Sequence, residues 1–370
     1  MTRIAFTGDA AFSKYFAKSC LREELLSDEV CRFLAESDYT VVNVEGAVSS
    51  GALRSDKPLA HANPHECLYW LRRVNGTVWN LANNHAMDCK EEGLYSTLAA
   101  AEECGAKPLG IGKDLNAASA PVILEGAGGI GLLAVTYSRD NRAAANTPGC
   151  FAAEDEEHLK AQIQEVKKRC RWCVVVSHVG QEFAQMPLPF LRRRYLRYLE
   201  YGADMVVGHH PHVVQNYETV GEKIIFYSLG NFIFDTDFQR AQKYTDSGML
   251  IRVSFTERDY RWEFLPLHIN RITQSVERGE RPAIFTDIQP AQYNLLWPLA
   301  ARDLCLNERI KFSFHDAAKR QYSGWDWLTK WELPRRNKTA GREMLKGRFL
   351  SLFQLWRLAD KSLVEYIRRR

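Results

Sequence analysis

The stretch Asp204-Met205-Val206-Val207-Gly208-His209-His210-Pro211-His212 joins a short apolar run to a cluster of three histidines. An apolar run of this length, bounded by polar residues, predicts a buried β-strand. The imidazoles of His210 and His212 can reach neighbouring metal ions from a strand end, because histidine is a common ligand of divalent transition metals. A His-Pro-His triplet alone is more often a polar loop, so its meaning depends on the rest of the chain.

Four other predicted strands end in the same way, with a polar side chain after an apolar run. The ends are Gly8-Asp9 after residues 3–7, Glu45 after residues 39–44, Asn84-His85 after residues 77–81, and His178 after residues 172–176. Ligands of open α/β sheets bind outside the carboxyl ends of the strands. We therefore expect these polar residues and the histidine cluster to lie along one edge of a sheet.

Helical segments alternate with the predicted strands. Helices are predicted over residues 21–35, 67–73, 91–104, 154–169 and 188–201, with further strands within residues 122–135, 224–227, 249–255 and 261–267. Strands alternating with helices of about 10 to 15 residues are typical of an α/β sheet. The sequence therefore predicts an α/β protein whose sheet is parallel in at least its first half.

The polar strand ends provide a mixed set of nitrogen and oxygen ligands. The candidate metal ligands are Asp9, Glu45, Asn84, His178, His210 and His212. Such a set suits Mn, Fe, Zn or a similar metal better than calcium. Six candidates exceed one tetrahedral site and suggest two ions, a recurring arrangement in enzymes that cleave phosphoesters.

Each candidate also has a structural interpretation. Asp9 could cap a helix, Glu45 could be a surface carboxylate, and Asn84 and His85 could shape a turn. The shared position at strand ends favours a functional role for all of them.

Several motifs, taken in this order, resemble the CapA family, which is named for poly-γ-glutamate capsule biosynthesis. They are Gly8-Asp9, Asn43-Val44-Glu45, Ala82-Asn83-Asn84-His85 with Asp88, His178-Val179-Gly180 with Glu182, Gly208-His209-His210-Pro211-His212-Val213-Val214-Gln215, and Ser228-Leu229-Gly230-Asn231-Phe232. The resemblance covers roughly residues 1–255. It implies a metallophosphoesterase-like fold of four αββα layers, with two sheets packed face to face and helices outside.

The resemblance also implies roles for individual residues. Asp9 and His212 would bind a first metal, Glu45 would bridge two metals, and Asn84, His178 and His210 would bind the second. His85 would protonate the leaving group, with Asp88 orienting it. His209 and Asn231 are candidate substrate contacts. Alternatively, His209 supports the metal ligands, and Asn231 forms part of a Gly-Asn turn.

One position departs from the pattern of metallophosphoesterases, which generally carry Asp-x-His in the first motif. Here Asp9 is followed by Ala10 and Ala11, so the first site lacks one imidazole. The cofactor is therefore predicted as one or two divalent ions (Mn, Fe, Zn or Mg).

The remaining histidines and the cysteines are interpreted as structural. The histidines without motif support are His61, His65, His158, His268 and His315, and Cys170-x-x-Cys173 is assigned to core packing. Nine cysteines, an odd number with irregular spacing, favour free thiols in a reducing cytoplasm. The chain starts without an apolar signal-peptide core and has no run of 18 apolar residues, so we expect a cytoplasmic protein.

The predicted organisation is a catalytic domain of residues 1–270 and a helical, basic extension of residues 271–370. Residues 331–370 contain 11 Lys and Arg against 4 Asp and Glu. Apolar residues near helical spacing predict a helix there that either docks on the catalytic domain or contacts the inner membrane face or a synthase. The net charge of +4 is too small to indicate nucleic acid as a partner.

We therefore predict a metal-dependent hydrolase that cleaves a phosphoester in an intracellular precursor of a capsule or cell-surface polymer. A small molecule or polymer precursor would be its substrate. The alternative is an assembly factor for polymer synthesis or export that is non-catalytic or acts on γ-glutamyl amides.

Overall fold

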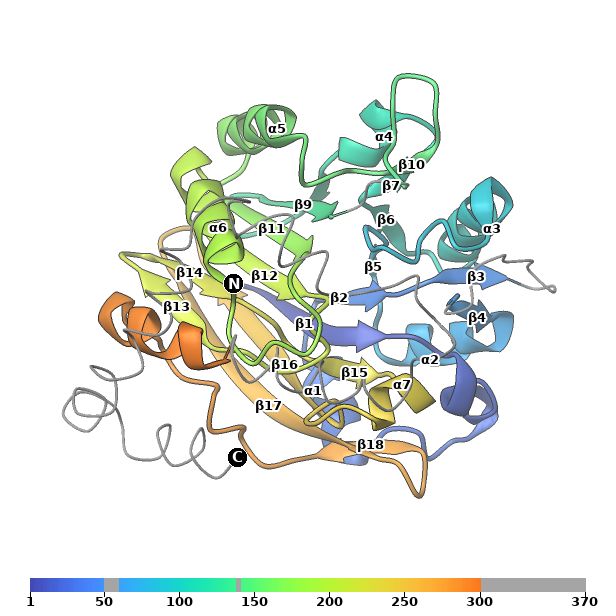
Figure 1. Cartoon of the computed structure of the whole chain (residues 1–370). Helices are drawn as coiled ribbons and strands as arrows, with labels where there is room; N and C mark the ends of the chain where they lie inside the picture. Colours follow the sequence, from blue (N-terminus) through green and yellow to red (C-terminus); the bar gives the residue numbers. More distant parts are fainter. Residues whose placement is uncertain (50–59, 138–140, 301–370) are drawn as a thin grey trace, which may run out of the picture.

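Two large β-sheets lie face to face in the computed structural model, which describes residues 1–49, 60–137 and 141–300 (Figure 1). One sheet has eight strands and the other has six. Two further pairs of short strands lie outside them.

The eight-stranded sheet has the order β18-β17-β16-β1-β2-β5-β6, with β15 paired to β1. Its strands are β1 (Thr2–Ala10), β2 (Tyr39–Val44), β5 (Val78–Asn80), β6 (Lys107–Leu109), β15 (Asn231–Ile233), β16 (Ser247–Phe255), β17 (Tyr260–Asn270) and β18 (Ser275–Arg278). Strands β1, β2, β5 and β6 are parallel, whereas β16, β17 and β18 continue the sheet in antiparallel pairs. The predicted parallel first half is confirmed.

The six-stranded sheet has the order β13-β14-β12-β11-β9-β8. Its strands are β8 (Val122–Leu124), β9 (Ile130–Thr136), β11 (Trp172–His178), β12 (Met205–His209), β13 (Tyr217–Val220) and β14 (Lys223–Phe226). The four middle strands are parallel. Strand β11 is buried along its whole length, and its Val-Val-Val run suits a strand covered on both faces.

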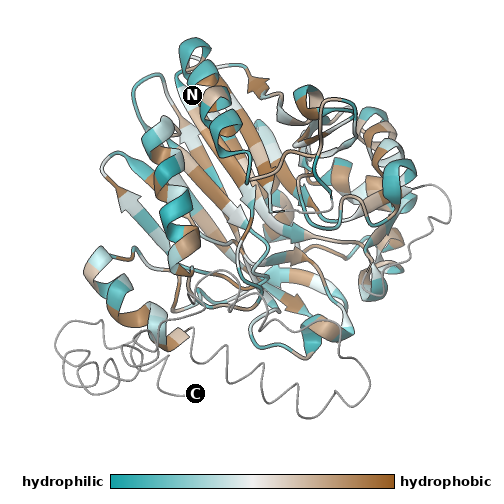
Figure 2. Ribbon diagram, turned by 45° about the horizontal axis from the view of Figure 1, so that its top comes forward, coloured by the Kyte–Doolittle hydropathy of each residue, from teal (hydrophilic) through white to brown (hydrophobic). Residues whose placement is uncertain are grey.

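Helices cover the outer faces of both sheets. The helices of the described residues include α1 (Asp28–Ala35), α2 (Leu68–Arg73), α3 (Lys90–Glu103), α4 (Leu115–Ser119), α5 (Glu156–Arg169), α6 (Pro189–Tyr201) and α7 (Asp237–Arg240). Helices α1, α2 and α3 pack on the eight-stranded sheet, whereas α5 and α6 pack on the six-stranded sheet. In Figure 2 the helices carry hydrophilic residues along one side and hydrophobic residues along the other, as packing on a sheet requires.

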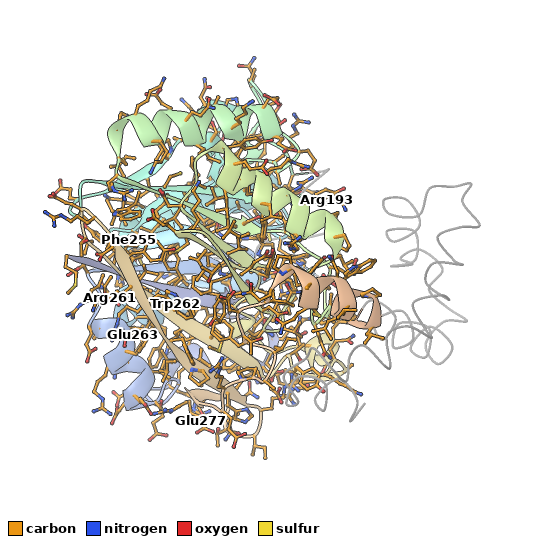
Figure 3. All side chains as sticks on the ribbon, turned by 90° about the vertical axis from the view of Figure 1, so that its left-hand side faces the viewer. Arg193, Phe255, Arg261, Trp262, Glu263 and Glu277 are labelled. Carbon is orange, nitrogen blue, oxygen red and sulfur yellow. The ribbon has the colours of Figure 1, made fainter. Side chains whose placement is uncertain are left out.

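Three cores separate these layers. The core between the sheets receives alternate side chains of both, such as Phe6 of β1 and Val176 of β11. On the same strands, Ala5 and Val175 point into the two outer cores. On β17, exposed Arg261 and Glu263 flank Trp262 (Figure 3), which contacts Phe226 of the other sheet at 5.1 Å. The four-layer αββα fold predicted from the family resemblance is therefore confirmed.

The helix predicted over residues 21–35 is shorter than expected and begins only at Asp28. Residues 25–27 instead pair with Val276 of β18, which donates its N–H to Leu25 and accepts that of Ser27. A tertiary strand contact therefore overrides the local helical preference. Ser27 then caps α1, its side chain accepting the N–H of Val30 at 3.5 Å.

Short strands were not predicted from the sequence because they carry too few residues for a periodic signal. They include two pairs outside the main sheets, β3 (Ala47–Ser49) with β4 (Ala62–Pro64) and β7 (Ile111–Gly112) with β10 (Gly149–Cys150). The first pair matters for the site described below.

Residues beyond 270 partly pack on the sheets. Strand β18 extends the eight-stranded sheet, and Phe285 and Tyr293 lie in the core between the sheets. Residues 301–370, with the predicted basic helix, lie outside the described residues, so the boundary near residue 270 stays a prediction. Among the described residues, no helix combines the length and the apolar character that crossing a bilayer requires.

Candidate metal centre

The carboxyl ends of parallel strands from both sheets meet at one place. Asp9 lies at the end of β1 in the eight-stranded sheet, and His212 follows β12 in the six-stranded sheet. Oδ2 of Asp9 and Nδ1 of His212 are 3.2 Å apart. The strand ends therefore converge as the sequence predicted.

Asp9, Glu45 and His212 form a first group of potential ligands. Each offers one ligand atom, these atoms all lie within 4.8 Å of one another, and all three residues are buried. Nε2 of His212 is 3.8 Å from Oε1 of Glu45. A carboxylate pair with an imidazole suits a divalent transition metal.

Asn84, His178 and His210 form a second group, of which His178 lies near Glu45. Nε2 of His178 lies 2.9 Å from Oδ1 of Asn84 and 3.8 Å from Oε1 of Glu45. The ring centres of His178 and His210 are 4.9 Å apart. The structure thus brings all six predicted ligands together, and Glu45 lies 3.8 Å from a histidine of each group. Their role as ligands stays a prediction.

Glu45 shows that the residues fit a cation. Both of its carboxylate oxygens are buried and, within the described residues, lack a hydrogen-bond partner. Burial raises the pKa of Glu45 to about 7. An unsatisfied buried carboxylate is costly, and a bound cation would remove that cost.

The histidines differ in protonation. Burial lowers the pKa of His178 well below its usual value and that of His210 to about 4, so both are neutral at neutral pH, as metal ligands must be. Burial also disfavours the charged form of His212, but Glu45 and Asp9 outweigh it and raise the pKa of His212 to about 10. A cation at this position would replace that proton.

The backbone of the histidine loop is unusual. His210 and His212 have φ angles of 93° and 56°, in the left-handed region that favours glycine. Such strained positions persist where the surrounding structure fixes them, and they cluster at functional sites.

Buried polar residues hold the ligands in place. Nδ2 of Asn43 donates to Oδ1 of Asp9 at 2.7 Å and lies 3.2 Å from Nδ1 of His178. Nδ1 of His212 lies 3.0 Å from Oδ1 of Asn231. Asn43 received no role in the sequence analysis because it lies within an apolar strand.

His209 and Asn231 are both buried and contact protein atoms. Nε2 of His209 lies 2.8 Å from the carbonyl oxygen of Thr7, and Nδ2 of Asn231 donates to the carbonyl of Thr245 at 2.8 Å. These contacts suit residues that support the centre. Their predicted substrate contact stays a prediction.

His85 and Asp88 form a pair beside Glu45. Nδ1 of His85 is 2.6 Å from Oδ2 of Asp88, and its Nε2 is 3.7 Å from Oε1 of Glu45. Burial disfavours the charged imidazole of His85, but Asp88 and Glu45 outweigh it and raise its pKa. The pair therefore has the charge and the geometry of a proton donor.

His61, interpreted from the sequence as structural, lies in the centre. Its ring centre is 4.3 Å from that of His85, and His61, Glu45 and His85 also form a group whose ligand atoms lie within 4.8 Å of one another. Pairing of Ala47 with Ala62 brings it there. No local sequence signal near His61 indicates this pairing.

The other described histidines lie apart from the centre. His65 pairs with Glu103 at the surface, and His158 contacts Ser119. Cys170 and Cys173 are buried free thiols, consistent with core packing. His315 and Cys305 lie outside the described residues.

The chain is similar to several known proteins. The family model described as bacterial capsule synthesis protein PGA_cap matches residues 3–236. The PGA biosynthesis protein CapA of Bacillus subtilis (strain 168) is 30% identical over 279 residues, which span 73% of this chain and 72% of that protein. The capsule biosynthesis protein CapA of Bacillus anthracis is 30% identical over 224 residues, which span 58% of this chain and 54% of that protein. A crystal structure of a 5'-nucleotidase from Candida albicans overlaps 83% of this chain and 58% of its own, with a TM-score of 0.41 and 9% identity.

Proposed function

Because the chain belongs to the PGA_cap family of bacterial capsule synthesis proteins, we propose that it is a metal-dependent hydrolase. Its substrate would be a phosphoester in a precursor of a capsule or cell-surface polymer. The predicted intracellular location of that precursor stays a prediction.

Glu45 carries the proposal. Its carboxylate is fully buried at the end of β2, and three imidazoles, those of His85, His178 and His212, lie 3.7–3.8 Å from its Oε1. A protein that needed only a stable core would place an apolar side chain here, because an unsatisfied buried charge opposes folding. A cation shared by these groups accounts for the arrangement.

The residues that would hold divalent ions are the two groups that meet at Glu45, namely Asp9 with His212 and Asn84 with His178 and His210. When bound, a divalent ion supplies Lewis-acid stabilisation of the charge that develops on a phosphoryl oxygen. Ala11 is buried where the first motif usually places a histidine, so the first group contains one imidazole fewer.

His85 would donate the proton that the leaving oxygen requires. Asp88 fixes the ring through Nδ1, which leaves Nε2, on the side of Glu45, as the atom that releases the proton. Nδ2 of Asn141 donates to the carbonyl of Asn84 at 2.8 Å and so fixes the backbone next to His85. Positioned acids of this kind contribute roughly 10²–10⁴-fold to rate.

The test is turnover of aryl phosphates and phosphodiesters by metal-free protein reloaded with Mn, Fe, Zn or Mg. We expect metal-dependent activity in the wild type and in His65→Ala, a surface control, and its loss in His178→Ala and His85→Ala. Stoichiometric metal binding without turnover on any phosphoester would instead support the amide-acting or non-catalytic assembly role. Absence of metal binding would remove the site assignment.

A further inference from the structure

Two aromatic side chains from distant parts of the chain meet beside His212. The ring of Phe183 lies 6.2 Å from that of His212 at an interplanar angle of 29°. The ring of Phe238 contacts Phe183 edge to face at 5.4 Å. Phe183 is partly exposed, and 44% of Phe238 is exposed. An apolar surface therefore borders a centre made otherwise of charged and polar groups.

Phe183 is held in place by its backbone. Its φ angle is 60°, in the left-handed region that non-glycine residues rarely adopt. Its N–H donates to the carbonyl of Pro211 at 2.8 Å. Pro211 lies between His210 and His212. One side chain supports the same segment: Nε2 of Gln215 donates to the carbonyl of Ala184 at 2.6 Å. The ring therefore has a fixed place relative to His212.

Phe238 lies on α7, a short helix fixed at both ends. The side chain of Thr236 accepts the N–H of Gln239 at 3.1 Å, and the hydroxyl of Tyr15 donates to Asp237 at 2.5 Å. The guanidinium of Arg240 lies 3.6 Å from the centre of the Tyr15 ring. Phe238 is thus exposed on a short helix whose two ends are held by side-chain contacts.

The position of the two rings points to a ligand that covers them. Exposed phenylalanine gains free energy when an apolar surface covers it, and rings prefer edge-to-face or offset contacts with other rings. We propose that Phe183 and Phe238 form a subsite for the organic group of the phosphoester, and that this group has a flat or ring-shaped apolar face. An aromatic base and the apolar face of a sugar both have this chemistry. The inference rests on the proposed function, because the metal centre anchors the phosphoryl group.

The experiment measures ligand binding rather than turnover. Calorimetry on the metal-loaded protein would compare phenylphosphonate with methylphosphonate, which share the anionic group and differ in the ring. We expect Phe238→Ala to raise the Kd of phenylphosphonate about tenfold more than that of methylphosphonate. Phe238→Tyr, which keeps the ring, should restore the ratio. Tyr95→Ala removes a ring that is 48% exposed on α3 and should change neither Kd.

Two further ligands distinguish an aromatic base from a sugar as the organic group that covers the two rings. The non-hydrolysable phosphonate analogues of adenosine monophosphate and glucose 1-phosphate would be compared in the same variants, and the ligand that loses more affinity identifies a base or a sugar. Equal changes for phenylphosphonate and methylphosphonate, or no change for either, would overturn the subsite while the metal centre stands. Failure of the wild type to bind any phosphonate would overturn the proposed function and the subsite together.

Discussion

Asp88 connects two histidines of the centre through one oxygen atom. Its Oδ2 lies 2.6 Å from Nδ1 of His85 and accepts the backbone N–H of His61 at 3.0 Å. Asp88 is 3% exposed. A single buried carboxylate therefore fixes the ring of the proposed proton donor and the segment that carries His61.

The first prediction concerns Asp88→Asn. The substitution removes a negative charge that raises the pKa of His85, so that pKa should fall. Because His85 must be protonated to act as an acid, the decline of kcat/KM at alkaline pH should begin at lower pH. At about pH 8 we expect a loss of about tenfold or more. The full pH profile of kcat/KM measures the shift.

Asp114→Asn is the matched control, because Asp114 caps α4 through Ala117 at 2.8 Å and asparagine caps helices equally well. An alkaline limb that stays in place in Asp88→Asn would show that His85 does not supply the proton.

The second prediction concerns the link between metal and stability. A ligand at about a hundredfold excess over its Kd stabilises the folded state by about 2.7 kcal/mol, which corresponds to a rise in Tm of about 4–5 °C for a domain of this size. We expect chelation to remove that rise in the wild type. His178→Ala should show little rise with any metal, whereas His65→Ala should behave as the wild type does. Differential scanning calorimetry measures both.

The sequence predicted those parts of the centre that have local signals. Asp9, Glu45 and His178 each follow an apolar run, and parallel pairing brings such ends together. His61 has no such signal, because its place depends on the pairing of β3 with β4 and on the backbone of Gly46. Gly46 has a φ of 87°, and a Cβ there would lie 2.4 Å from the carbonyl oxygen of His61.

Long-range contacts explain the other differences. The helix predicted over residues 21–35 is shortened by strand pairing with Val276, far along the chain. Phe183 and Phe238 meet through tertiary packing that no periodicity indicates. Interactions of this kind depend on the completed fold, so a pattern within a short window cannot reveal them.

The third prediction tests the close approach of the His61 backbone to Gly46, the residue that follows Glu45. Gly46→Ala would force a Cβ against the His61 backbone as well as impose an unfavourable φ. Gly221→Ala imposes only the second cost, because Gly221 has a φ of 61° and no atom within 4 Å of the added Cβ. We expect Gly221→Ala to destabilise by about 1 kcal/mol and Gly46→Ala by about 2–4 kcal/mol. Equal losses of unfolding free energy in urea would contradict the close approach.

The fourth prediction concerns the buried thiols. Burial raises the pKa of Cys173 to about 12 and that of Cys67 well above its usual value. Since the thiolate is the reactive form, iodoacetamide should leave both unmodified in the folded protein at about pH 8 and label both in urea. Peptide mapping by mass spectrometry measures each site. Rapid labelling of Cys173 in the folded state would contradict the assignment of Cys170-x-x-Cys173 to core packing.

The last prediction concerns the effect of Glu45 on stability. We expect Glu45 to destabilise the metal-free protein and to stabilise the metal-bound protein. The folded-state pKa of about 7 lies above the ordinary value of 4.5, so the folded protein binds more protons than the unfolded chain between these values. The contribution of Glu45 to the stability of the metal-free wild type should therefore fall as pH rises from about 5 to about 7, and should change little above that range. Glu45→Gln has no such proton to lose.

Glu45→Gln should consequently be more stable than the wild type without metal at neutral pH, by about 1–3 kcal/mol. With metal the order should reverse, because the variant lacks the carboxylate that joins the two ligand groups and gains little from the cation. Urea unfolding of both proteins, with and without Mn or Zn, measures whether the order of their unfolding free energies reverses. A variant that is less stable than the wild type in both conditions would mean that Glu45 serves the fold. A reversal of the order on metal binding would instead mean that the fold tolerates an unfavourable buried charge because the metal requires it.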